Sequence, residues 1–210
     1  MAKIIEWILM GGWAMLPLTA CFIYTMSIII DRMRAMRAKN IINKALIQEI
    51  HEWEEGQIPA SITELCQKGE TLMDRMVLLC IKNVSYPKYD NAQLMSSMLQ
   101  KEIQKLEAGT PTLRVFSTVG PHIGLFGTIL GLTTVFYGAY NSGKELADQG
   151  PIIAKGIAEA FNTTLLGLIN AIAAVAGLAW IDSRIEKYYC TIDSICNELM
   201  GKMYDLMPEK

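Results

Sequence analysis

The stretch AFNTTLLGLINAIAAVAGLAWI, residues 160–181, decides the fold because it contains no charged residue. Glu159 precedes it and Asp182 follows it. A helix that rises about 1.5 Å per residue needs roughly 20 apolar residues to cross about 30 Å of hydrocarbon. Buried helices of soluble domains seldom run this long without a charge. The stretch therefore predicts a membrane-spanning helix.

Two further charge-free stretches predict two more spans. One lies between Glu6 and Asp31, and the other lies between Arg114 and Lys144. The stretch between Glu6 and Asp31 is longer than the apolar core of a signal peptide, which has about 7–15 residues. No small-residue cleavage site precedes Asp31. We therefore expect the first span to stay in the protein as an anchor.

The composition agrees with a membrane protein. Of the 210 residues, 51% are hydrophobic and only 19% are charged, with a formal net charge of -2. Soluble domains contain about 25% charged residues. These values exclude a disordered tail, a basic nucleic-acid-binding module and a disulfide-rich secreted scaffold. The five cysteines show neither a C-x-x-C pair nor zinc spacing, so we expect them to be reduced core residues.

The basic residues predict the orientation, with the N-terminus outside and the C-terminus in the cytoplasm. A basic cluster directly follows the first span, and only Lys3 precedes that span. Cytoplasmic loops are enriched in Lys and Arg. The predicted segments are a periplasmic N-terminus with transmembrane helix 1 (1–31), a cytoplasmic helical region (32–113), transmembrane helix 2 (114–140), a periplasmic loop (141–151), transmembrane helix 3 (152–181) and a cytoplasmic amphipathic helix (182–210).

The predicted cytoplasmic segments have helical patterns. One helix should run on from the first span until Gly56 and Pro59, and Asp90 should be the N-cap of another that is interrupted near Gly109 and Pro111. Apolar residues at spacings of three and four predict a helix between these two and a buried stripe on the tail. The first set is Leu72, Met73, Met76, Val77 and Cys80; the tail set is Ile181, Ile185, Tyr188, Ile192, Ile195, Leu199, Met203 and Leu206.

Small residues mark the second and third spans as helices that contact other helices. Glycines that recur on one face let two backbones approach closely in lipid, although membrane helices are rich in glycine in any case. The glycines of the second span are Gly120, Gly124, Gly127, Gly131 and Gly138. The small half of the third span carries Gly156, Ala160, Thr163, Thr164, Gly167, Asn170, Ala171, Ala174 and Gly177. The opposite half is bulky and apolar, so the small half should face other helices or a water-filled pore.

The polar residues of the third span have two interpretations. Glu159 is either an interfacial residue paired with Lys155 or a group in a helix bundle or at an ion vestibule. Asn162, Thr163, Thr164 and Asn170 extend a polar path inward, although threonines in membrane helices often bond only their own backbone. No acidic residue lies near the middle of any span, so a complete proton relay would need a carboxylate from elsewhere.

Nothing in the sequence predicts an enzyme. There is no phosphate loop, no G-x-S-x-G and no H-E-x-x-H, and the histidines His51 and His122 lie on separate segments. His122, at the start of the second span, is a helix-end contact or a pH sensor.

Two motifs resemble the MotA/TolQ/ExbB proton-channel family, closest to its ExbB/TolQ branch. VGPHIGLFGTILG, residues 119–131, resembles the second-span signature of this family. GIAEAFNTT, residues 156–164, followed by Gly167-Leu168, resembles the third-span signature. The three-span layout with a long cytoplasmic insertion also matches the branch.

The resemblance implies a stator subunit of an ion-driven motor in the bacterial inner membrane. It implies a homopentamer around an ExbD/TolR-like dimer that supplies the membrane aspartate, and a periplasmic TonB/TolA-like protein that receives the work. Thr128 and Thr164 match the pore threonines of the family, and Glu159 matches its glutamate near the periplasmic mouth. The packing glycines would be Gly120, Gly124, Gly127, Gly131, Gly156 and Gly167.

The chain departs from the usual pattern of this branch in four places. Ala173 replaces a frequent proline, Thr163 and Asn170 replace small apolar residues, and Asn162 adds a polar group. Extra oxygen atoms would suit Na⁺, whereas the branch resemblance favours H⁺, so both ions stay open. No other cofactor is expected. The alternative function is a non-conducting oligomeric membrane scaffold, and the sequence does not identify the process that is energised.

Overall fold

The computed structural model describes residues 15–54, 58–143 and 146–204, and every regular element in these ranges is a helix. The all-α fold predicted from the sequence is therefore confirmed for the described part of the chain. The beginning of the predicted first span lies outside the described residues. The same holds for Gly56, Lys144 and Leu206.

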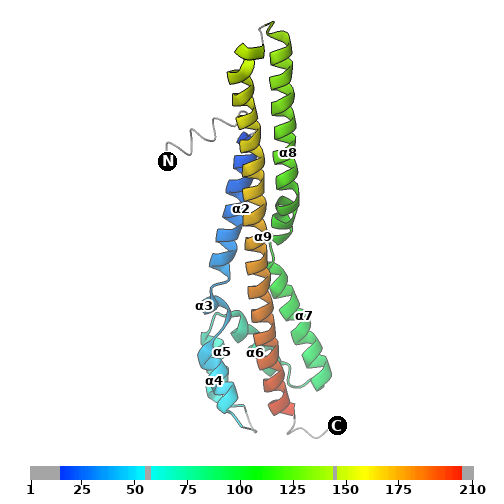
Figure 1. Ribbon diagram of the computed structural model, residues 1–210. Helices are drawn as coiled ribbons and strands as arrows, with labels where there is room; N and C mark the ends of the chain where they lie inside the picture. Colours follow the sequence, from blue (N-terminus) through cyan, green and yellow to red (C-terminus); the bar gives the residue numbers. More distant parts are fainter. Residues whose placement is uncertain (1–14, 55–57, 144–145, 205–210) are drawn as a thin grey trace. The chain divides into compact units, whose positions relative to one another are not determined.

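Three helices are long and apolar enough to cross a membrane (Figure 1). They are α2 (Met15–Ala35), α8 (Thr110–Asn141) and α9 (Leu146–Tyr204). This confirms the three predicted spans, while the direction in which they cross the membrane stays a prediction. Helix α9 has one proline, Pro151, near its start, and no proline follows it in the helix, so the apolar stretch from residue 160 to residue 181 passes into the amphipathic tail without a break.

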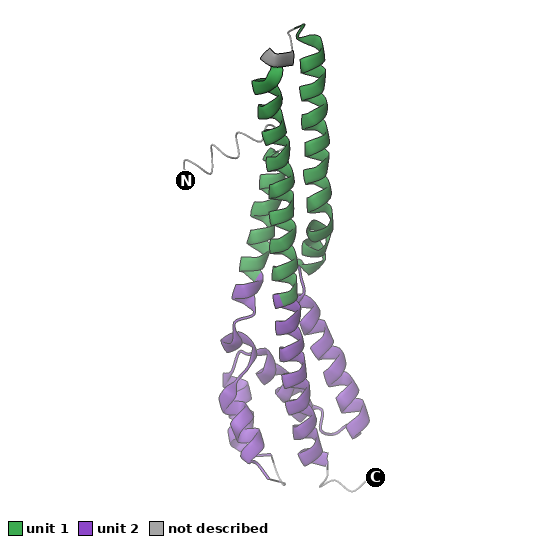
Figure 2. Cartoon of the chain, viewed as in Figure 1, with its two compact units in different colours: residues 1–31, 109–179 green, residues 32–108, 180–210 purple. Residues whose placement is uncertain are grey.

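The chain forms two compact units, which Figure 2 shows in different colours. Unit 1 contains residues 1–31 and 109–179, and unit 2 contains residues 32–108 and 180–210. Within unit 1, the described parts of α2, α8 and α9 lie side by side.

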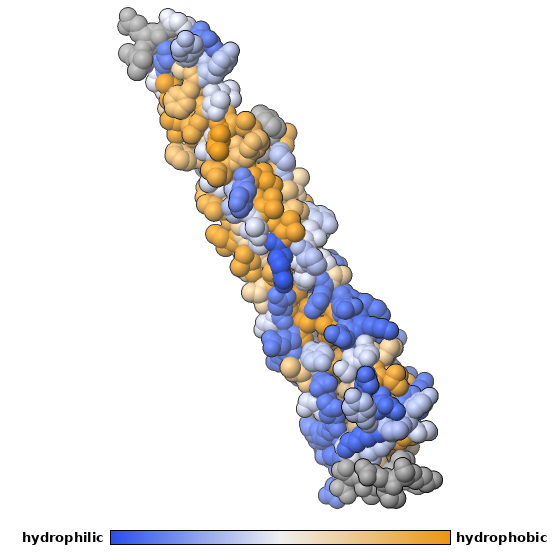
Figure 3. Space-filling model, turned by 90° about the vertical axis from the view of Figure 1, so that its right-hand side faces the viewer, coloured by the Kyte–Doolittle hydropathy of each residue, from blue (hydrophilic) through white to orange (hydrophobic). Residues whose placement is uncertain are grey.

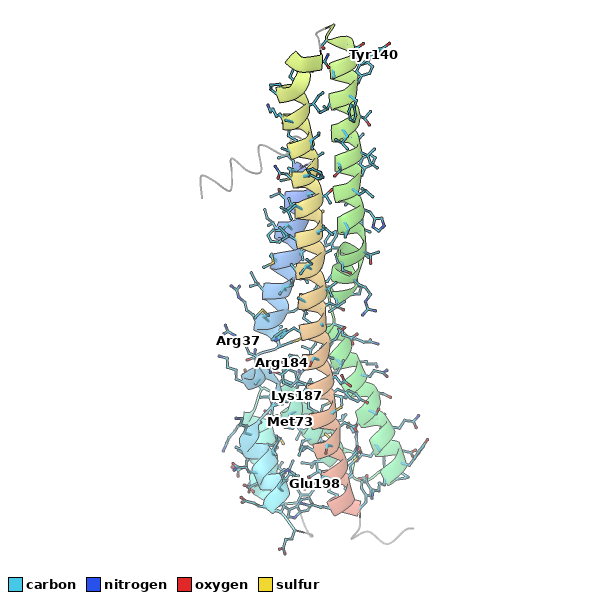
Figure 4. All side chains as sticks on the ribbon, in the orientation of Figure 1. Arg37, Met73, Tyr140, Arg184, Lys187 and Glu198 are labelled. Carbon is cyan, nitrogen blue, oxygen red and sulfur yellow. The ribbon has the colours of Figure 1, made fainter. Side chains whose placement is uncertain are left out.

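The face of unit 1 that Figure 3 shows is largely apolar, as its orange colour indicates. Large side chains that are exposed include Phe161, Ile172 and Phe136. Tyr140, at the end of α8, is 87% exposed and projects outward in Figure 4. Exposed apolar patches of this kind mark surfaces that contact lipid or other protein. Tyrosine is also enriched where a span meets the membrane–water interface.

Unit 2 is a bundle of helices around the C-terminal part of α9. Its other helices are α3 (Ala38–Ile41), α4 (Lys44–Glu52), α5 (Ala60–Lys68), α6 (Leu72–Lys82) and α7 (Lys88–Leu106). Met73, labelled in Figure 4, is fully buried in this unit. The described members of the predicted tail stripe are all buried, which confirms that α9 packs against helices here: Ile181, Ile185, Tyr188, Ile192, Ile195, Leu199 and Met203.

The prediction that one helix continues from the first span to Gly56 is wrong. The chain leaves the helix after Ala35, and Arg37 and Ile42 have extended backbone angles. Tyr188 donates a hydrogen bond of 2.8 Å to the carbonyl of Met36. Asn43 then caps α4 by accepting from the amides of Ala45 and Leu46. Contacts with α9 therefore satisfy backbone groups that a continuous helix would have satisfied internally.

The predicted N-cap at Asp90 is also wrong. Helix α7 begins earlier, at Lys88, and Pro87 occupies the N-cap position with an extended backbone. Asp90 instead lies in the first turn, where an acidic side chain interacts favourably with the helix dipole. The predicted interruption is confirmed, because α7 ends at Leu106 and Gly109 has a φ of 86° before α8 begins.

Asp74 organises the start of α6 in unit 2. Its side chain is fully buried and accepts hydrogen bonds from the amide (3.0 Å) and the hydroxyl (2.6 Å) of Thr71. The amide nitrogen of Asn43 donates a third bond, of 2.9 Å. Thr71 in turn accepts from the Asp74 amide, which completes a capping box. One carboxylate thus joins the starts of two helices.

We predict that Asp74→Ala lowers the free energy of unfolding by about 2–4 kcal/mol. The substitution removes a cap and leaves the half-buried Asn43 side-chain amide without this acceptor. The measurement is chemical or thermal unfolding of the purified protein. Asp90→Ala is the matched control, since Asp90 is exposed, and it should cost less than about 1 kcal/mol. Equal losses in the two variants would contradict this role for Asp74.

Candidate functional site

Helices α8 and α9 of unit 1 run antiparallel and approach each other closely at glycines. A Cβ atom placed on Gly124 would lie 2.9 Å from the carbonyl oxygen of Thr163 and 3.1 Å from the Cα of Thr164. A Cβ on Gly167 would lie 2.7 Å from the carbonyl oxygen of Gly120. Only glycine leaves enough room for the backbones at these positions.

The same contact continues along both helices. Gly127 lies against the side chain of Thr163, and Gly131 lies against Ala160. Gly156 lies against the side chain of Val135. All six predicted packing glycines therefore lie at the α8–α9 interface, whereas Gly138, on the same helix, has no atom of the described chain within 4 Å of a Cβ position.

Three threonine hydroxyls meet at the centre of this interface. Thr128 of α8 lies within hydrogen-bonding reach of Thr164 of α9, and its Oγ1 lies 3.5 Å from that of Thr163. We call Thr128, Thr163 and Thr164 the threonine cluster. The close approach at Gly124 and Ala160 brings these side chains together, because larger residues there would separate the two helices.

Two backbone carbonyls complete the threonine cluster. Thr128 donates to the carbonyl of Ala160 (3.0 Å) across the interface, and Thr163 donates to that of Gly124 (3.2 Å). Thr128 and Thr163 also reach carbonyls of their own helices. The local bonding expected of membrane threonines is thus present, with interhelical bonds in addition. The sequence did not identify these carbonyls, since any residue type can supply one.

The other predicted polar residues occupy different positions. Glu159, one turn from Thr163, is part-exposed, with its carboxylate 3.9 Å from the Lys155 ammonium. Asn162 is half-buried. Asn170 is fully buried and lies against Gly120, away from the threonine cluster. The structure therefore brings the threonines together but places Asn170 in a second location.

His122 is exposed, and its Nδ1 lies 2.6 Å from the carbonyl oxygen of Thr118, one turn earlier on α8. This is a contact within the helix. Whether His122 senses pH stays a prediction.

The threonine cluster is polar but carries no charge. Hydroxyls and carbonyls can exchange hydrogen bonds with a passing proton carrier or replace part of the hydration of a cation. They cannot hold a proton as a carboxylate does. Between Glu159 and Asp182 the chain has no acidic residue, so the cluster lacks the carboxylate that a proton relay needs.

Three helices long enough to span a membrane, with an uncharged polar cluster between two glycine-packed helices, define a helical multi-span membrane protein. The chain belongs to the MotA/TolQ/ExbB proton channel family, which matches residues 26–193. The relatives place it in the ExbB/TolQ branch. It is an inner-membrane protein, and proteins of this branch are channel or scaffold proteins and not enzymes.

Three curated relatives illustrate the similarity. An ExbB-like biopolymer transport protein of Synechocystis sp. is 28% identical over 79% of this chain and 78% of its own length. The biopolymer transport protein exbB1 of Vibrio cholerae is 23% identical over 85% of this chain and 81% of its own length. The Tol-Pal system protein TolQ of Pseudomonas aeruginosa is 36% identical over 54% of this chain and 49% of its own length.

We predict that Gly124→Ala lowers the free energy of unfolding by about 1–3 kcal/mol, because the added methyl group meets backbone atoms of α9 that cannot move aside. The measurement is the thermal midpoint of the purified protein in detergent. Gly138→Ala is the matched control on the same helix. It should leave the midpoint unchanged or raise it, because alanine is the better helix former and space is available. Equal midpoints for the two variants would contradict the close-approach interpretation.

Proposed function

We propose that this chain is the stator subunit of an inner-membrane ion-driven motor that uses the proton motive force. In this proposal an ExbD/TolR-like partner with one membrane span supplies the aspartate that carries the ion. A periplasmic TonB/TolA-like protein receives the work. The names of the relatives support this function, since they are biopolymer transport and Tol-Pal system proteins.

The single observation that carries the proposal is the threonine cluster at the middle of two spans with no acidic residue at its level. A carboxylate from a partner would complete the cluster. Threonine hydroxyls at hydrogen-bonding distance would then stabilise that carboxylate in its charged form and lower the barrier to its deprotonation. This arrangement requires two chains, because neither supplies all the groups.

Hydrogen bonding within the cluster favours H⁺ over Na⁺ as the transported ion. Each of the three hydroxyls already has a carbonyl or hydroxyl oxygen within 3.5 Å. A bound Na⁺ would need several of these oxygens at once and would disrupt their mutual hydrogen bonds. A proton can pass between hydrogen-bonded hydroxyls when these rotate, while the oxygen atoms stay in place.

The assembly in this proposal is a homopentamer around a dimer of the partner, as the family resemblance implies. The exposed apolar surface of α8 and α9, which includes Leu125, Phe126 and Phe161, supports contacts between subunits or with lipid. Glu159, part-exposed and paired loosely with Lys155, would lie near the periplasmic mouth of the ion path.

We predict that Thr164→Val lowers ion flux about tenfold in the complex reconstituted with its partner in liposomes, because a hydroxyl contact worth about 1.4 kcal/mol is lost. Thr133→Val is the matched control. Thr133 is exposed on α8, and its hydroxyl donates to the carbonyl of Ile129 at 2.8 Å, so its loss should leave the flux unchanged.

Glu159→Ala should also reduce the ion flux, because it removes the charge at the mouth of the ion path.

The measurement is the pH change inside liposomes under an imposed membrane potential, repeated with Na⁺ gradients. Full flux in both Thr164→Val and Glu159→Ala would contradict the assigned roles. No flux of either ion in the unmodified complex would support the alternative of a non-conducting scaffold. Flux that depends on Na⁺ and not on pH would reassign the ion.

A further inference from the structure

Two side chains in the core of unit 1 are buried without a hydrogen-bond partner in the described chain. Neither Oδ1 nor Nδ2 of Asn170 has a partner, and the same holds for Oγ1 of Thr25 on α2. Both residues are 0% exposed. Thr19, on the same helix, donates instead to the carbonyl of Met15 at 2.7 Å. Buried polar groups are costly unless they are hydrogen-bonded, so these atoms require a hydrogen-bond partner.

Helix α2 runs parallel to α9, and the contacts between them set the level of Thr25. Leu18 packs with Leu166, and Ile29 lies against Gly177. Thr25 shares a face with Leu18 and Ile29, since it lies seven and four residues from them. In the register of these two contacts, Thr25 of α2 lies opposite Ala173 of α9. Thr25 therefore lies within one helical turn of Asn170, on the side of α2 that faces α9.

Helix α8 contributes a third polar group, the backbone carbonyl of Ser117, near the height of Thr25 along the helices. The Nδ2 atom of Asn170 lies 3.4 Å from the Cβ position of Gly120. Pro121 has no N–H, so the carbonyl of Ser117 loses its usual helical donor. Ser117 lies one turn before Gly120, and α8 is antiparallel to α9. The carbonyl of Ser117 is therefore close to the level of Thr25.

We propose that Asn170, Thr25 and the carbonyl of Ser117 form a site that binds one or two water molecules inside the three-helix core. Water is the ligand that fits, because Asn170 leaves both a donor and an acceptor unpaired. A cation such as Na⁺ would use only oxygen atoms and would leave the Asn170 N–H groups unsatisfied. A buried water typically makes about three hydrogen bonds, which matches the groups available.

The position of this hydration site suggests its role, which rests on the proposed function. Asn170 lies six residues beyond Thr164 on α9, about 9 Å along the helix axis, on the opposite side of the threonine cluster from Glu159. Bound water there provides the proton with a polar step beyond the threonines. Without it, the path away from the cluster would cross apolar side chains.

A double-mutant cycle in the full chain, assembled with its partner, tests the site. The variants are Thr25→Val, Asn170→Leu and the double substitution, and the readout is the thermal midpoint. If water joins the two residues, each single substitution removes a hydrogen bond of that water and lowers the midpoint by a few degrees, about 3 °C. The double substitution leaves a dry apolar core. Its loss in thermal midpoint should therefore be smaller than the sum of the losses in the two single variants.

The opposite result overturns the site. If the two residues are independent and unsatisfied, each substitution raises the midpoint and the effects add. Thr19→Val is the control, and its effect should add to that of Asn170→Leu because Thr19 bonds only its own helix. Should a variant fail to fold, an experimental density map of the unmodified complex at about 2 Å decides the matter by the presence or absence of ordered water beside Asn170.

Ion flux tests the role separately. The double variant should conduct several-fold less than the unmodified complex, while Thr19→Val conducts normally. Unchanged flux in the double variant would overturn the role in conduction. A complex that conducts in no form would overturn the proposed function and leave the stability cycle as the measure of the water site.

Discussion

The close approach of α8 and α9 at Gly124 and Gly167 is the constraint on which the rest of unit 1 depends. Lipid provides no hydrophobic drive between helices, so van der Waals contact and interhelical hydrogen bonds must hold them. The two backbones are so close that no Cβ atom fits between them, and this provides the van der Waals contact. The same close approach brings Thr128 within reach of the Ala160 carbonyl, and this provides the interhelical hydrogen bond. Packing and polarity in this helix pair therefore have one cause.

This constraint also explains how a membrane-embedded chain can keep many polar atoms at low cost. In the threonine cluster each hydroxyl finds an oxygen on its own or the neighbouring helix. Asn170 and Thr25 lack such partners, and they lie where a proline on α8 removes a regular helical bond. The threonine hydroxyls can turn their protons from these oxygens towards a carboxylate supplied by a partner, whereas Asn170 and Thr25 need a hydrogen-bond partner such as water in any case.

Much of the fold could be predicted from sequence because charge-free stretches and helical periodicity are local signals. The stripe from Ile181 to Met203 is an example, since its spacing alone required a helical neighbour. The break after Ala35 could not be predicted from local signals, because the Met36 carbonyl there accepts its hydrogen bond from Tyr188, a residue far along the chain. The start of α7 at Lys88 was missed because two possible caps, Pro87 and Asp90, lie within one turn.

The sequence by itself determined the three spans, the family and the polar residue types of the second and third spans, since each depends on composition or on motifs of adjacent residues. Only the tertiary structure decided which of these residues meet. Thr163 joins Thr128 and Thr164, while Asn170 lies apart from them with Thr25 at its level. The physical reason is the register between helices. Glycine spacing permits a close approach, but the partner residue at each glycine follows from the relative shift of two helices, which no single segment contains.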